Sequence, residues 1–147
     1  PMSGLVLFSP YLRVQHWLEP YAGWLKWFRP YQVKSEADNS QKHYYRRRPL
    51  AGIHQINRLI KRVRSQLPLI TCPVQAFNGE GDQTVDIESG RELIDRMASE
   101  IKDYRCYGTD VPHVLTREEN PYRVEIFTQA IGFIQGLEGP EPTVSTR

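Results

Sequence analysis

The sequence has little of what marks disulfide-rich, metal-bound or membrane-spanning proteins. Two cysteines in 147 residues allow at most one disulfide, too few for a stapled scaffold. The four histidines lack the spacing of a zinc site, so we expect no structural metal. The longest uninterrupted apolar run, Leu5 to Phe8, is far short of the roughly 20 residues of a membrane-spanning helix. The remaining composition, 39% hydrophobic and 24% charged, is that of a globular domain.

Three segments predict the strands of a sheet. Gly4 to Phe8 is a continuous apolar run closed by Ser9-Pro10, which is typical of a central strand buried on both faces. Pro73 to Asn78 and Ile101 to Tyr107 predict two further strands. Helical patterns separate these strands, and that alternation favours a parallel sheet. The fold class that we expect is therefore α/β.

Three segments have the apolar periodicity of helices. Leu50 to Leu67 repeats apolar residues close to a helical stripe, and Pro68 should end that helix. Asp86 is expected to cap the helix that follows the Pro73 to Asn78 strand. The last helix, Glu119 to Leu137, carries apolar residues at helical spacing: Val124, Phe127, Ile131 and Ile134.

The segment before the Leu50 helix is rich in aromatic and basic residues. Positions 11–45 hold nine of the 16 aromatics and are broken by Pro20 and Pro30, which predicts short aromatic-rich helices. Positions 42–64 carry eight Lys or Arg residues and no Asp or Glu, a formal charge of +8, whereas the rest of the chain has a formal charge of −6. Such a block could bind nucleic acid, an anionic lipid surface or an acidic substrate, but it is more often a solvated helix face. No nucleic-acid recognition fold appears, so we expect no nucleic-acid partner.

Two ionisable residues follow neighbouring strands at the point where each strand ends. Asp82 follows the Pro73 to Asn78 strand through a Gly-x-Gly turn, and His113 follows the Ile101 to Tyr107 strand through a loop. The carboxyl ends of parallel strands meet at one edge of the sheet, where functional groups gather. A carboxylate beside a histidine there can orient the imidazole and stabilise the imidazolium. The alternatives are an ordinary turn residue and an ordinary surface histidine.

The run from Ile70 to Val85, followed by a helix, a strand, Gly108, His113 and a last amphipathic helix, resembles the C-terminal half of α/β-hydrolases. It is most similar to carboxylesterase and monoacylglycerol-lipase-like serine hydrolases. The resemblance implies that Asp82 is the acid and His113 the base of a Ser-Asp-His triad, with no metal or organic cofactor. The loop before His113 is longer than usual in that family, which leaves Asp110 as a competing partner for the histidine.

The resemblance also implies a partial α/β-hydrolase fold, a parallel sheet flanked by helices with a helical cap insertion. Residues 1–10 would form a core strand and residues 11–67 the aromatic and basic cap. Residues 68–137 would form the C-terminal core that carries the acid and the base, and residues 138–147 a flexible tail.

The nucleophile of that family has no counterpart in this sequence. It sits in a G-x-S-x-G elbow that precedes the acid and the base, and no such motif occurs here. Ser9 alone among the serines follows a predicted core strand, but it precedes Pro10 and has no elbow around it. We therefore expect the nucleophile and the oxyanion hole on a segment upstream of this chain. The chain alone should be inactive.

The partners that we expect follow from this hypothesis. They are a small ester or acylglycerol substrate and an N-terminal hydrolase segment that carries the nucleophile. Weak contact with a membrane surface and a homo-oligomer remain open, as does localisation, with the cytoplasm favoured. The aromatic stretch either lines an acyl pocket, with Trp17, Trp24 and Trp27 as candidates, or only packs the cap onto the sheet.

Two further expectations concern the rival function and the thiols. The rival is a non-catalytic interaction module that uses the basic cap face and an open sheet edge.

Cys72 and Cys106 should be free thiols, because they fall at opposite ends of neighbouring parallel strands.

Overall fold

The computed structural model describes residues 2–13, 31–33 and 47–138. The chain divides into two compact units, Pro1–Gln15 with Gln66–Arg147, and His16–Ser65. Within the described ranges, no helix has the length and apolar character needed to cross a membrane.

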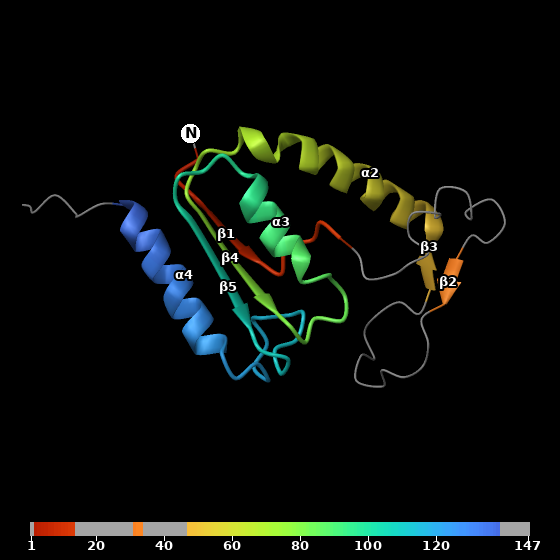
Figure 1. Cartoon of the computed structure of the whole chain (residues 1–147). Helices are drawn as coiled ribbons and strands as arrows, with labels where there is room; N and C mark the ends of the chain where they lie inside the picture. Colours follow the sequence, from red (N-terminus) through yellow and green to blue (C-terminus); the bar gives the residue numbers. More distant parts are fainter. Residues whose placement is uncertain (1, 14–30, 34–46, 139–147) are drawn as a thin grey trace, which may run out of the picture. The chain divides into compact units, whose positions relative to one another are not determined.

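The first unit contains a three-stranded parallel sheet in the order β1-β4-β5 (Figure 1). Its strands are β1 (Leu5–Phe8), β4 (Val74–Gly79) and β5 (Lys102–Tyr107). They match the three strands predicted from the sequence. All six residues of β4 are buried, because β4 pairs with a strand on either side and is covered on both faces. The parallel α/β sheet is thus confirmed.

Helices α3 (Glu88–Arg96) and α4 (Arg123–Glu138) cover opposite faces of this sheet (Figure 1). Adjacent residues of β4 point to opposite faces, and they contact different helices. Asn78 lies against Gly90 of α3, whereas Phe77 packs with Ile126 and Ala130 of α4. The sheet is therefore a central layer between two helices.

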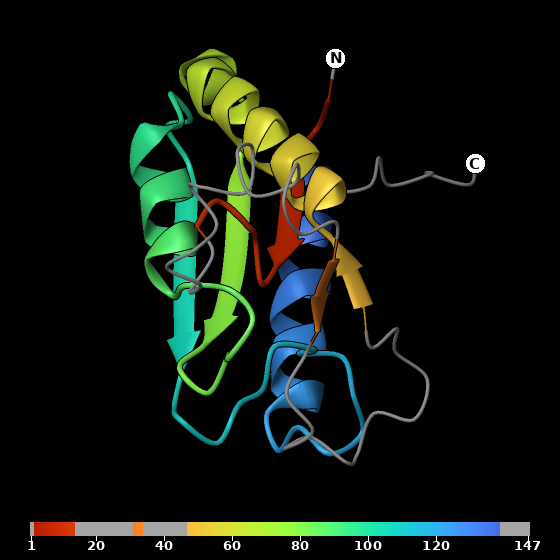
Figure 2. The same cartoon turned by 90° about the vertical axis from the view of Figure 1, so that its right-hand side faces the viewer.

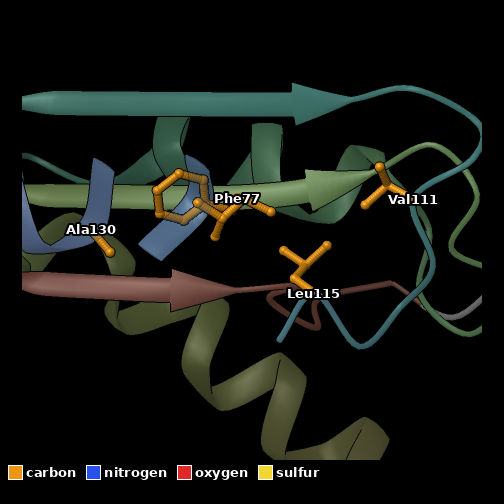
Figure 3. Close-up of a cluster of buried hydrophobic side chains, with 5 residues drawn as sticks. Phe77, Val111, Leu115 and Ala130 are labelled. Atoms are coloured by element: carbon orange, nitrogen blue, oxygen red, sulfur yellow. The ribbon is translucent and has the colours of Figure 1, made fainter. Parts of the chain in front are cut away.

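The α4 side of the sheet holds a buried core of five residues. Figure 3 shows Phe77 of β4, Ala130 of α4, and Val111 and Leu115 from the loop after β5. Ile126 of α4 completes the cluster. Full burial of each large apolar side chain contributes about 1.5–3 kcal/mol. Because two of these residues come from the loop after β5, the core fixes the path of that loop.

The position of β1 differs from the prediction of a central strand buried on both faces. In the described sheet β1 is an outer strand that pairs only with β4, and its residues are partly buried or exposed. The ring of Phe8 stacks on Phe77 with centroids 5.5 Å apart, yet Phe8 is 38% exposed. The prediction of a central position is wrong for this sheet, since no described strand covers the outer side of β1.

Helix α3 begins close to the predicted cap. Its first residue is Glu88, and Asp86 lies two positions earlier. Asp86 Oδ1 accepts a hydrogen bond from the Glu88 backbone N–H at 2.9 Å. The carboxylate thus satisfies one of the free N–H groups at the start of the helix.

Helix α4 (Arg123–Glu138) starts four residues later than predicted, and the apolar stripe that located it is not the side that it buries. Asn120 forms a turn before it, donating from Nδ2 to the Leu115 carbonyl at 2.7 Å and accepting at Oδ1 from the Tyr122 N–H at 3.0 Å. Ile126 and Ala130 face the core. The stripe at helical spacing is exposed instead: Val124, Phe127, Ile131 and Ile134. The helix carries apolar residues on both sides, so periodicity locates it without revealing which side is buried.

In the second unit, β2 (Tyr31–Val33) pairs antiparallel with β3 (Arg47–Pro49), and α2 (Leu50–Gln66) follows directly (Figure 2). Helix α2 matches the predicted helix, and Pro68 lies in the short 3-10 helix η2 (Leu67–Leu69) after it. The two strands were not predicted, because three residues are too few for a periodic pattern. The aromatic-rich helices and the tail were predicted for segments that lie largely outside the described residues.

Candidate active site

Asp82 is positioned by a glycine-containing turn that packs closely on another loop. β4 ends at Gly79, and the Asp82 N–H donates to the Gly79 carbonyl at 3.2 Å. A Cβ on Gly79 would collide with the Val111 carbonyl, and one on Gly81 with the Thr109 carbonyl. Both glycines are therefore needed for the turn after β4 to approach the loop after β5.

The carboxylate of Asp82 is buried and held by backbone donors. Its Oδ1 accepts hydrogen bonds from the N–H groups of Thr84, at 2.7 Å, and Val85, at 2.9 Å. Its Oδ2 lies 2.7 Å from Nδ1 of His113. The side chain is 1% exposed. Hydrogen bonds on both oxygens compensate the cost of burying the carboxylate and fix its direction.

His113 lies in the loop after β5, between two buried anchors. Val111 and Leu115 insert into the core on either side of it (Figure 3). The His113 side chain is 37% exposed. An ionised carboxylate only accepts hydrogen bonds, so beside an ionised Asp82 this contact requires the tautomer with the proton on Nδ1, in which Nε2 is an acceptor. The ring can therefore take up a proton at Nε2 while Asp82 holds it in place.

The His113 backbone has a second support, from Ser9. The Ser9 hydroxyl donates to the His113 carbonyl at 2.6 Å, and Ser9 is buried. Sequence analysis missed this bond, because no sequence pattern links a hydroxyl to a carbonyl 104 positions away.

The structure describes some of the predicted site residues and not others. The structure brings Asp82 and His113 together, whereas the competing Asp110 is exposed. The catalytic roles of the pair stay predictions. Trp17, Trp24 and Trp27 lie outside the described residues.

The remaining candidates for metal or charged-partner binding are acidic, sulfur and basic side chains. In the part of the chain that the structure describes, no three His, Cys, Asp or Glu residues are grouped to hold a metal ion. Cys72 and Cys106 are free thiols, as predicted. Arg58, Lys61 and Arg62, from the basic block, are exposed on α2.

Comparison with known proteins gives similarity in structure alone. No family model matches the sequence, and no curated protein matches it. Solved structures do match, among them one reported for LipS and LipT, two metagenome-derived lipolytic enzymes (TM-score 0.72, 16% identity, 92% of this chain and 56% of that one).

Two more of these structures are a monoacylglycerol lipase and a monoglyceride lipase. The first, from Paleococcus ferrophilus, has a TM-score of 0.70 and 16% identity over 92% of this chain and 60% of that one. The second, a soluble variant from Saccharomyces cerevisiae, has a TM-score of 0.62 and 12% identity over 92% and 55%. The chain spans little more than half the length of these structures. It therefore adopts part of the α/β-hydrolase fold.

Proposed function

We propose that this chain is the acid-and-base portion of a serine hydrolase that acts on carboxylic esters. The observation that carries the proposal is the 2.7 Å contact between Asp82 Oδ2 and His113 Nδ1, with the carboxylate buried and the imidazole partly exposed. The similar solved structures are those of lipases and lipolytic enzymes, which supports an ester or acylglycerol as the substrate.

The reaction that this pair would serve is acyl transfer to a serine on another segment. His113 Nε2 takes the proton of the serine hydroxyl as its oxygen attacks the acyl carbonyl carbon, and Asp82 stabilises the imidazolium. The imidazolium returns the proton to the leaving alcohol as the ester C–O bond breaks. Water then attacks the acyl-serine with the same proton transfers, which releases the acid and restores the serine.

The segment that carries the nucleophile is the partner that we propose for the apolar surface at β1 and α4. That surface comprises the outer side of β1 with the exposed Phe8, and the exposed α4 stripe. Phe8 and Phe127 join the two parts, with ring centroids 6.4 Å apart. A further strand beside β1 and a helix over α4 would cover it. Two of the solved structures that match this chain extend well beyond it, since the match covers 56% and 60% of their lengths.

A second candidate function uses the same surface without catalysis. Exposed apolar patches and open strand edges bind partner proteins. An interaction module would use them, with the cations of α2, and would need no contact between Asp82 and His113. The buried carboxylate beside a partly exposed imidazole favours the hydrolase.

The test is to locate the nucleophile in the purified protein. We expect a fluorophosphonate probe, which labels activated serines, to modify a serine in a G-x-S-x-G motif on a segment that copurifies with this chain. Intact mass and peptide sequencing identify that segment. A label on one of the eight serines of this chain would contradict the proposal. Ester turnover that survives complete labelling would contradict it as well.

The aromatic stretch offers a further test of the substrate class. If Trp17, Trp24 and Trp27 line an acyl pocket, their replacement by alanine should raise KM more for long-chain than for short-chain p-nitrophenyl esters. Equal effects on both chain lengths would assign these rings to packing alone.

A further inference from the structure

Ser9 has a backbone conformation that serine rarely adopts. It follows β1 directly and has a φ of 45°, the one positive φ of a non-glycine residue in the described ranges. Residues other than glycine are disfavoured in this left-handed region of backbone conformation. Such a residue persists only where surrounding interactions hold it, and residues of this kind cluster at functional sites.

Two hydrogen bonds tie Ser9 to the strands and the loop of the candidate site. Its backbone N–H donates to the Phe77 carbonyl at 2.8 Å, which extends the pairing of β1 with β4 beyond Phe8. Its hydroxyl donates to the His113 carbonyl at 2.6 Å. Ser9 and the following Pro10 are both buried. Ser9 thus joins the end of β1 to the loop that carries the histidine.

We propose that Ser9 is a positioning residue for His113. The inference rests on the proposed function, since it concerns how the general base is held. Asp82 binds the imidazole ring, and Ser9 binds the backbone carbonyl of the same residue. Together they fix the histidine at both ends within an irregular loop. Displacing a catalytic group by about 1 Å can cost about 100-fold in rate, so a second support for the backbone matters.

Two substitutions separate the hydroxyl from the strained backbone. Ser9→Ala removes the hydroxyl and keeps a Cβ at positive φ, whereas Ser9→Gly removes the hydroxyl and also relieves the strain. Ser99→Ala is the matched control. Ser99 is also buried, and its hydroxyl donates to the Ile101 carbonyl at 2.8 Å, before the start of β5 rather than after its end.

The measurement on the chain itself is nuclear magnetic resonance of the His113 imidazole. We expect both Ser9 variants to shift the Nδ1 signal and to speed exchange of the Nδ1 proton with water by about tenfold, because the loop is released. Ser99→Ala should lower stability without changing either property. Ser9→Gly should melt at a higher temperature than Ser9→Ala.

In the protein that carries the nucleophile, both Ser9 variants should lower kcat for ester hydrolysis by up to about 100-fold, with KM changed much less. His113 signals and kcat that stay at the wild-type level in both variants would overturn the inference. If the signals change and no His113-dependent turnover exists, Ser9 positions the histidine and the hydrolase proposal fails. The two failures are therefore distinguishable.

Discussion

The two outer strands of the sheet differ in the side chains that they expose. β5 carries Lys102, Asp103 and Arg105, and Asp103 accepts hydrogen bonds from Arg105 at 3.0 Å and from Gln75 at 2.8 Å. β1 has no charged residue and ends in the exposed Phe8. Charged residues are a common protection of sheet edges against pairing with other strands. β5 therefore has the composition of a true edge, whereas β1 has that of a strand that pairs on both sides.

The contacts between the α4 region and the two outer strands differ in the same way. Toward β5, the Tyr107 hydroxyl donates to Glu125 at 3.2 Å. The ring centroids of Tyr107 and Tyr122 are 5.1 Å apart. Toward β1, the contact is between the rings of Phe8 and Phe127, both partly exposed. The described contacts toward β5 thus include a hydrogen bond between side chains. The apolar side is suited to further packing, and it is where we propose that the nucleophile segment binds.

Loss of the Asp82 carboxylate should have an effect second only to loss of the His113 imidazole. In the protein that carries the nucleophile, Asp82→Asn should lower kcat for ester hydrolysis by about 10,000-fold, because the amide favours the wrong imidazole tautomer. The matched control is Asp110→Asn, which changes an exposed acid of the neighbouring loop and should leave kcat within about twofold. Equal losses in the two variants would mean that the buried pair has no special role.

The next effect tests the two faces of α4. Ile126 is 1% exposed and Ile131 is 52% exposed. Ile126→Ala should lower the free energy of unfolding of this chain by about 2–5 kcal/mol, and Ile131→Ala by no more than about 0.5 kcal/mol. Denaturant unfolding measures both. A large cost for Ile131→Ala in the isolated chain would show that the stripe is already covered.

Gly79 tests the close approach on which the site depends. We expect Gly79→Ala to lower the free energy of unfolding by about 1–3 kcal/mol, because its Cβ would collide with the Val111 carbonyl. Gly132→Ala is the control, since Gly132 is an exposed helical glycine with nothing near its Cβ position. That variant should stabilise the chain by about 1 kcal/mol. A neutral Gly79→Ala would contradict the described packing of the two loops.

The open edge of β1 predicts self-association when no other segment covers it. Phe8→Lys places a charge at this edge, and we expect it to reduce association of the isolated chain with itself. Light scattering over a range of concentrations measures this. The control is Cys106→Lys on the other outer strand, which is charged already. If the wild-type chain stays monomeric at all concentrations, the apolar edge does not drive association.

The smallest effect concerns Tyr107 and alkaline pH. Burial, followed by the charge of Glu125, raises the pKa of Tyr107 to about 12 from 10.0. The folded state therefore keeps the phenolic proton after the unfolded state has lost it, so stability from this group is present below pH 10 and is lost as pH rises toward 12. Urea unfolding across this range should show the decline, and Tyr107→Phe should make it shallower. An unchanged decline in Tyr107→Phe would assign it to other groups.

The parts that sequence predicted best are those with strong local patterns. β4 is a buried strand that leads into a turn with two glycines and Asp82. Because parallel strands end at one edge of a sheet, the sequence also predicted that His113 lies near Asp82. The buried side of α4 was beyond prediction, because its two apolar stripes compete for the core. β2 and β3 are too short for a pattern. Ser9 acts through a bond between distant parts of the chain, which only the fold brings together.

The most direct test of the central claim is ester turnover in His113→Ala. The protein that carries the nucleophile is assayed with p-nitrophenyl butyrate beside His54→Ala, a control that changes a histidine of α2. We predict that His113→Ala lowers kcat by at least about 10,000-fold and that His54→Ala leaves it unchanged. Turnover at the wild-type rate in His113→Ala would contradict the claim that this chain supplies the acid and the base of a serine hydrolase.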